Sequence, residues 1–192
     1  MSTLKHLPVA DLKAKYGLVN FVETGTCAGD GLRFALSCGF ERYFSCDIVQ
    51  KFADQVAEEF RADLRVTIVN ADSLRFLEAL PRDIGPSFFW LDAHQPKLYD
   101  PRIVEEGSSR FPLPDEIKTI KARPGYERDV IMADDLIVIE GSPRWHAGEV
   151  CEELLVRSFT FEELCALLAD THDVGVDLDM EGTVTFTPKA GS

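Results

Sequence analysis

The chain has 192 residues, 45% of them hydrophobic, which is sufficient for the core of one domain. Its 33 acidic and 20 basic residues give a formal net charge of −13, which disfavours a surface that binds nucleic-acid phosphates. No apolar run approaches the roughly 18 to 20 residues of a membrane helix, and the N-terminal segment lacks the apolar core and cleavage site of a signal peptide. We therefore expect a single cytoplasmic domain over residues 1–192, with neither a membrane nor a nucleic acid as partner.

Short apolar runs alternate with stretches of helical period along the chain, which predicts repeated β-α units. In chain order, the predicted strands cover 18–22, 42–46, 65–70, 87–91 and 129–133. The predicted helices cover 31–38, a segment ending at 60, 74–80, 115–122 and 160–169. Thr160 and Glu163 form a capping-box pattern at the start of the last helix. Two alternating runs, 172–179 and 183–188, predict a C-terminal hairpin.

This order of elements predicts an α/β fold with a doubly wound, mostly parallel, seven-stranded sheet that ends in an antiparallel β-hairpin. Sheets of this kind bind ligands beyond the carboxyl ends of their parallel strands. The polar residues that follow the predicted strands are therefore the candidates for a site. A polar segment follows the fourth strand, and its part 95–114 is too long and too polar for a bare connection, which is typical of a binding lid or a disordered loop.

A glycine-rich turn follows the first predicted strand, with Glu23, Gly25, Thr26 and Gly29 in the pattern Glu-x-Gly-Thr-x-x-Gly. Glycines allow a ligand to approach the backbone closely, and the start of the next helix offers free N–H groups to an acceptor. A tight turn that binds nothing has the same pattern. The turn alone therefore leaves both interpretations open.

Acidic residues also end the second and third predicted strands. Asp47 lies where an acid of such folds accepts hydrogen bonds from both hydroxyls of a ribose. Asp72, with Ser73 after it, lies where an acid can receive the exocyclic amine of adenine. Each aspartate could instead cap the helix that follows it, which is the commoner role of Asp at this position.

A second group of acids follows strands four and five: Asp92, with His94 two residues later, and the pair Asp134 and Asp135. Carboxylates at adjacent strand ends repel one another unless a cation, protonation or solvent compensates them. Hard oxygen ligands suit Mg²⁺. The pair could instead cap the next segment, and His94 could be a general base, a fourth metal ligand or an exposed loop residue.

The turn at Glu23, Gly25 and Gly29, followed by Asp47 and Asp72 and by a terminal hairpin, resembles the cofactor signatures of class I S-adenosylmethionine-dependent methyltransferases. The similarity covers about residues 18–188 and implies a Rossmann-like methyltransferase fold. It also implies roles: Gly25, Thr26 and Gly29 line the methionine part of the cofactor, and Glu23 organises the turn. Asp47 holds the ribose, while Asp72 and Ser73 face the adenine.

The acids after strands four and five resemble the metal site of divalent-metal-dependent small-molecule O-methyltransferases. The resemblance implies that Asp92, Asp134 and Asp135 hold Mg²⁺ or another divalent cation and that Asp92 also borders the cofactor. It implies O-methylation of a small-molecule acceptor, with His94 and Asp92 as catalytic residues. The segment before the first strand is shorter than the helical cap of these enzymes, so a partner subunit in a homodimer is one way to close the acceptor pocket.

Two other functions remain open at this point. One is a non-catalytic cofactor-binding or assembly protein with the same fold. The other is a metal-dependent hydrolase or hydroxylase that acts on a sugar-like substrate. Fold alone does not decide among them, because function resides in the site.

Overall fold

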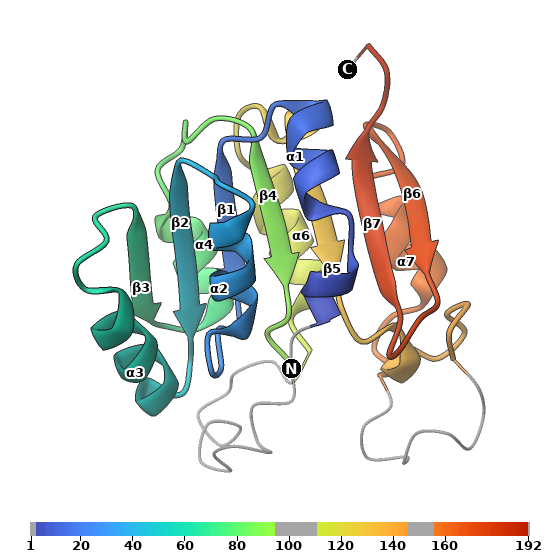
Figure 1. The fold of residues 1–192 in the computed structure, drawn as a ribbon. Helices are drawn as coiled ribbons and strands as arrows, with labels where there is room; N and C mark the ends of the chain where they lie inside the picture. The colour runs from blue at the N-terminus through green and yellow to red at the C-terminus, as the bar shows by residue number, and fades with distance from the viewer. Residues whose placement is uncertain (1–2, 95–110, 146–155, 192) are drawn as a thin grey trace.

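The chain is organised around one mixed β-sheet (Figure 1). The computed structural model describes residues 3–94, 111–145 and 156–191. Within these ranges the sheet has seven strands in the order β3-β2-β1-β4-β5-β7-β6. The strands are β1 (Asn20–Thr24), β2 (Arg42–Asp47), β3 (Val66–Asn70), β4 (Ser87–Leu91), β5 (Val130–Ala133), β6 (His172–Asp177) and β7 (Thr183–Pro188).

The pairing of the strands confirms the predicted fold. Strands β1 to β5 pair in parallel, β7 pairs antiparallel with β5, and β6 pairs antiparallel with β7. The sheet is therefore mostly parallel and ends in an antiparallel hairpin, as the order of apolar runs predicts.

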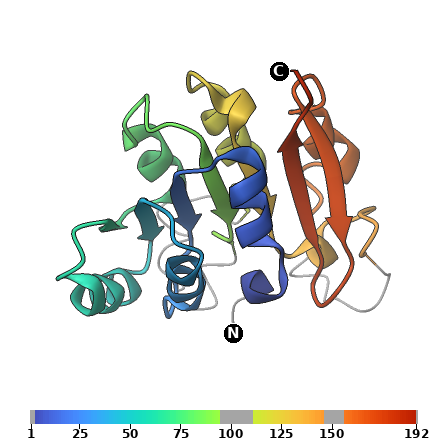
Figure 2. The same ribbon diagram turned by 45° about the horizontal axis from the view of Figure 1, so that its top comes forward.

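Helices cover both faces of the sheet (Figure 1, Figure 2). One face carries α1 (Val9–Tyr16), α2 (Asp30–Ser37) and α3 (Gln50–Phe60), and the other carries α4 (Ser73–Ala79), α6 (Leu113–Lys121) and α7 (Phe161–Ala166). Three short 3-10 helices complete the described part: η1 (Thr3–His6), η3 (Tyr126–Arg128) and η4 (Leu136–Val138). None of the helices described is long and apolar enough to cross a membrane.

The alternation of side chains along the central strands divides the core in two. Phe88 belongs to the core beneath α1 and α2, whereas Phe89 belongs to the core beneath α4 and α6. Every residue of β4 is buried, because helices cover both of its faces. The apolar run 87–91 predicts the bounds of this strand correctly.

The first strand begins and ends two residues later than its apolar run predicts. Leu18 lies before the strand, where its N–H donates to Lys13 O. Asn20 is polar but belongs to the strand, because its buried amide donates to Ile84 O (2.6 Å) and to Ser87 Oγ (3.2 Å). Hydrogen bonds thus extend β1 over residues that hydrophobicity excludes.

Helix α1 was not expected from the sequence. It begins after Pro8 and ends before Gly17, which has a positive φ of 63° and whose N–H donates to Lys13 O. Proline near the start and glycine just after the end are ordinary helix signals. The helix has only eight residues and one fully buried side chain, Val9, so its apolar periodicity is weak.

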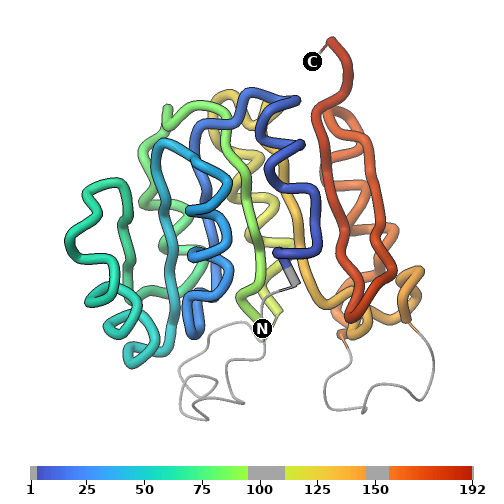
Figure 3. Tube along the Cα trace, viewed as in Figure 1, coloured from blue at the N-terminus to red at the C-terminus, as the bar shows by residue number. Residues whose placement is uncertain are grey.

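Strands β1, β2, β4 and β5 run in the same direction, so the chain leaves all of them on the same side of the sheet (Figure 3). We call this side, where the carboxyl ends of the parallel strands lie, the edge of the sheet. This edge brings together the polar segments that the sequence places after these strands.

Candidate functional site

The turn after β1 packs directly against the end of β4. Gly25 has a φ of +81°, and a Cβ atom at this position would lie 2.4 Å from Asp92 O. The N–H groups of Gly25 and Thr26 both donate to Cys46 O of β2, each at 2.9 Å. The positive φ and the close approach both require glycine here. Because of this contact, the turn and the acidic segment after β4 lie directly next to each other.

Asp47 fixes the far side of the same turn. Its Oδ2 accepts a hydrogen bond from Cys27 N (2.7 Å), and its Oδ1 accepts one from Val49 N (2.8 Å). Cys27 has a φ of +45°, an unusual conformation for a residue with a side chain. Burial raises the pKa of Asp47 and the two backbone donors lower it, with burial prevailing. Each carboxylate oxygen has a second lone pair for a further donor, such as a hydroxyl group.

Asp72 takes the helix-capping role that the sequence also allows. It precedes α4, and its Oδ1 accepts a hydrogen bond from Leu74 N (3.0 Å). Ser73 is the first residue of the helix and is buried. The strand order places these residues beyond β2 and Asp47 when counted from β1, so the turn after β1, Asp47 and Asp72 follow one another along the sheet.

Glu23 lies within β1 and not after it. Its side chain is buried, and its Oε2 accepts a hydrogen bond from Ser45 Oγ (2.6 Å), which belongs to the residue opposite it on β2. Burial raises the pKa of Glu23 to about 7, although the hydroxyl groups of Ser45 and Thr26 oppose this shift. The carboxyl group of Glu23 thus links β1 to Ser45 of β2, two residues before Gly25 of the turn.

The second predicted group also gathers at one place, around His94. His94 Nε2 lies 2.6 Å from Asp135 Oδ2 and 3.4 Å from Asp92 Oδ1. The His94 ring stacks on Phe111, with ring centroids 5.0 Å apart. Asp134 is buried, and its Oδ1 accepts a hydrogen bond from Asp135 N (2.9 Å). We call Asp92, His94, Asp134 and Asp135 the acidic corner.

Opposing charges set the protonation of the acidic corner. Burial lowers the pKa of His94, but the hydrogen bond and the charge of Asp135, together with Asp92 and Asp134, raise it to about 9. Burial raises the pKa of Asp135, and the contact with His94 outweighs this effect and lowers it. Burial, Asp134 and Asp135 raise the pKa of Asp92 well above its usual value. In this arrangement His94 donates to Asp135.

The acidic corner fits a divalent cation in the chemistry of its donors but not in their present positions. Three carboxylates supply the hard oxygen atoms that Mg²⁺ prefers. Among the described residues, however, no three Asp, Glu, His or Cys side chains converge on a point that an ion could occupy. His94 instead contacts both Asp135 and Asp92.

Glu116 is a buried acid beside the candidate site that the sequence analysis did not single out. It belongs to α6, is 1% exposed, and lies beside the hydroxyl groups of Thr24 and Ser73. A signal was present: Glu116 falls in the apolar stripe formed by Leu113, Ile117 and Ile120, where a charged residue is unexpected. Tyr99, Arg102 and Arg110 of the predicted lid lie outside the described ranges, whereas Phe111 of the same segment is described.

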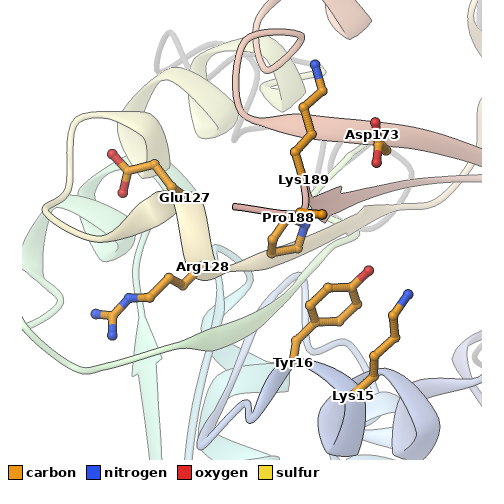
Figure 4. A pocket seen from close by; sticks show the side chains of 8 residues that line it. Lys15, Tyr16, Glu127, Arg128, Asp173, Pro188 and Lys189 are labelled. Atoms are coloured by element: carbon orange, nitrogen blue, oxygen red, sulfur yellow. The ribbon is translucent and has the colours of Figure 1, made fainter. Parts of the chain in front are cut away.

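A separate pocket of about 420 Å³ lies at the opposite edge of the sheet, near the end of α1 and the start of β6 (Figure 4). Its lining residues are Lys15, Tyr16, Glu127, Arg128, Asp173, Pro188, Lys189 and Ala190. Lys189 Nζ donates to Ala169 O (2.6 Å) and Lys15 Nζ lies 4.7 Å from the centre of the Tyr16 ring, so both lysines already have partners. We do not assign the site to this pocket, because ligands of such sheets bind at the carboxyl ends of the strands.

No protein-family model and no curated protein sequence matches the chain. Solved structures do. An O-methyltransferase from Bacillus cereus in complex with SAH has a TM-score of 0.62 at 19% identity, over 98% of this chain and 82% of that one. The O-methyltransferase TomG from Streptomyces achromogenes, involved in tomaymycin synthesis and bound to SAM, has a TM-score of 0.55 at 16% identity, over 95% and 78%.

A different kind of methylase is also similar. Ribosomal protein L11 methylase from Lactobacillus delbrueckii subsp. bulgaricus has a TM-score of 0.54 at 11% identity, over 95% of this chain and 77% of that one. Together these likenesses show that the chain has a Rossmann-like methyltransferase fold, as the resemblance predicted. They do not select an acceptor, because proteins of this fold methylate different ones.

Proposed function

We propose that the chain is an S-adenosylmethionine-dependent methyltransferase that methylates an oxygen atom of a small molecule. One observation carries the proposal. Gly25, in the predicted cofactor turn, packs against the backbone of Asp92, the first residue of the acidic corner. A group-transfer enzyme needs its donor and acceptor sites to adjoin in this way, because transfer requires the reacting atoms to be held close together.

The cofactor would lie along the edge formed by β1, β2 and β3. Gly25, Thr26 and Gly29 would receive its methionine part, and Asp47 would accept hydrogen bonds from the ribose on the lone pairs that Cys27 N and Val49 N leave free. Asp72 and Ser73 would face the adenine, and Asp92 would border the sulfonium end. When bound, the cofactor supplies an electrophilic methyl group.

The acidic corner would hold and deprotonate the acceptor. Phe111 fixes the plane of the His94 ring, and Asp135 fixes its Nε2. Because Nε2 carries the proton that it donates to Asp135, His94 can take a proton from an acceptor hydroxyl at this nitrogen only after it has passed its own proton on, and Asp135 is the adjacent group that can receive it. Phe111 is buried and also packs on Phe159, with ring centroids 5.9 Å apart, which gives this side of the site an apolar wall suited to a small organic acceptor.

A divalent cation belongs to this proposal through the resemblance to metal-dependent O-methyltransferases. Asp92, Asp134 and Asp135 would hold it, and His94 would move off Asp135 to admit it. When bound, such an ion orients an acceptor oxygen and lowers its pKa.

The experiment that tests the function is a search for methyl transfer. The protein is incubated with cofactor carrying an isotopically labelled methyl group and a panel of phenols, catechols and sugars, with magnesium and with chelator. We expect one labelled methyl group on an oxygen of at least one acceptor, and its loss in His94→Ala. Label on nitrogen or carbon, or products of hydrolysis or hydroxylation, would contradict O-methylation.

A further inference from the structure

Helix α6 carries an acidic residue where its pattern calls for an apolar one. Leu113, Ile117 and Ile120 are at most 3% exposed and form its buried stripe, and Glu116 lies in the same stripe at 1% exposure. A buried carboxyl group lowers stability unless it is well bonded, and an apolar side chain of similar size would fill the space without this cost. A polar residue that breaks the local pattern is a common sign of function.

Glu116 faces two other elements of the site. Its carboxyl group lies beside Thr24, the last residue of β1, and beside Ser73, the first residue of α4. Burial raises the pKa of Glu116 to about 7, while the two hydroxyl groups and His94 oppose this shift. Among the described residues, Glu116 Oε1 and Thr24 Oγ1 have no hydrogen bond of regular geometry, although both are buried.

The two contacts fall at the two halves of the predicted cofactor site. Thr24 immediately precedes Gly25, whose position against Asp92 shapes the turn for the methionine part. Ser73 immediately follows Asp72, the acid predicted to face adenine. Helices α4 and α6 pack side by side on the same face of the sheet (Figure 1). Glu116 is thus placed to fix the distance between the turn and the start of α4.

We propose that Glu116 is a positioning residue for the cofactor: its buried carboxyl group lies beside Thr24 and Ser73 and so sets the spacing of the methionine and adenine halves of the site. This role rests on the proposed function. Glu116 touches no reacting atom in it. It acts through the two residues that it holds.

The test measures the affinity for S-adenosylhomocysteine by calorimetry, and the melting temperature, in four proteins. Glu116→Met replaces the carboxyl group with an apolar chain of similar length, and we expect it to weaken binding about tenfold or more without lowering the melting temperature. Glu116→Gln keeps an acceptor oxygen and should bind within about threefold of wild type. Asp115→Asn, an exposed neighbour on the same helix, is the matched control and should not change binding.

A second variant covers the case in which Glu116→Met does not fold. Thr24→Val removes one hydroxyl group at nearly constant shape and should weaken binding by a similar factor, because it alters the same contact from its other side. Wild-type affinity in Glu116→Met, or in Thr24→Val, would overturn the positioning role alone. Absence of binding by the wild type would instead overturn the proposed function on which that role rests.

Discussion

At the scale of single residues, a substitution at Asp134 distinguishes two roles of this residue, a metal ligand and a cap of the segment that follows it. Its Oδ1 accepts a hydrogen bond from Asp135 N, which the amide oxygen of asparagine can also do. Asp134→Asn therefore removes one charge and keeps the local hydrogen bond. If the acidic corner binds a cation, Mg²⁺ should raise the melting temperature of the wild type by mass action and should not raise that of the variant.

The control in the same experiment is to melt the wild type and Asp134→Asn with a chelator, which removes divalent ions. Without an ion, the loss of one negative charge beside Asp92 and Asp135 should leave the variant as stable as the wild type or more stable. Four coincident curves, from both proteins with magnesium and with chelator, would remove the metal from this account and leave Asp134 as a cap.

The acids at the strand ends could be predicted from the sequence because a parallel sheet brings its carboxyl ends to one edge. The contact between His94 and Asp135 could not, because the two residues lie on different segments and nothing local sets their distance. Glu116 was missed for another reason. It belongs to a helix and not to a strand end, so only its place among Leu113, Ile117 and Ile120 marks it.

At the scale of elements, the approach of the β1 turn to β4 predicts a large cost for any side chain at Gly25. Gly25→Ala combines a φ of +81° with a Cβ 2.4 Å from Asp92 O, and we expect it to lower the free energy of unfolding by roughly 3 kcal/mol or more. Gly39→Ala is the control, because Gly39 has a φ of +72° with nothing within 4 Å, and should cost only about 1 kcal/mol. Urea titration measures both, and equal costs would contradict the close approach.

The bounds of elements were predictable where hydrophobicity alone sets them. Strand β4, covered on both faces, has the predicted bounds. Strand β1 does not, because the hydrogen bonds of Asn20 and Glu23 keep polar side chains inside it. The capping box at Thr160 and Glu163 is confirmed, with α7 beginning at the next residue. That helix ends at Ala166, three residues before its predicted end.

At the scale of the whole molecule, buried acids predict how stability depends on pH. Burial raises the pKa of Glu23 and of Glu116 to about 7, above the value of about 4.3 expected in the unfolded chain. Between these values the folded state binds more protons than the unfolded state. The contribution of these groups to stability is therefore fully present below about pH 4 and is lost as the pH rises through about 7.

A comparison of variants isolates this effect. Glu116→Gln cannot ionise, so between pH 5 and pH 8.5 its free energy of unfolding should rise relative to the wild type by roughly 1 to 3 kcal/mol. Glu78→Gln, at an exposed position on α4, should show no such change. Denaturant titrations at the two pH values measure the difference, and a constant gap between wild type and Glu116→Gln would mean that Glu116 is ionised throughout.

The central claim, that the edge formed by β1, β2 and β3 binds S-adenosylmethionine, is tested most directly by calorimetric titration of the protein and of Asp47→Ala with S-adenosylhomocysteine. The wild type should bind at one site per chain. The variant loses the acceptor for the ribose hydroxyls and the hydrogen bond to Cys27 N that fixes the turn, and its affinity should fall by roughly 2 to 4 kcal/mol. No binding by the wild type, or equal affinity in the two proteins, would contradict the account.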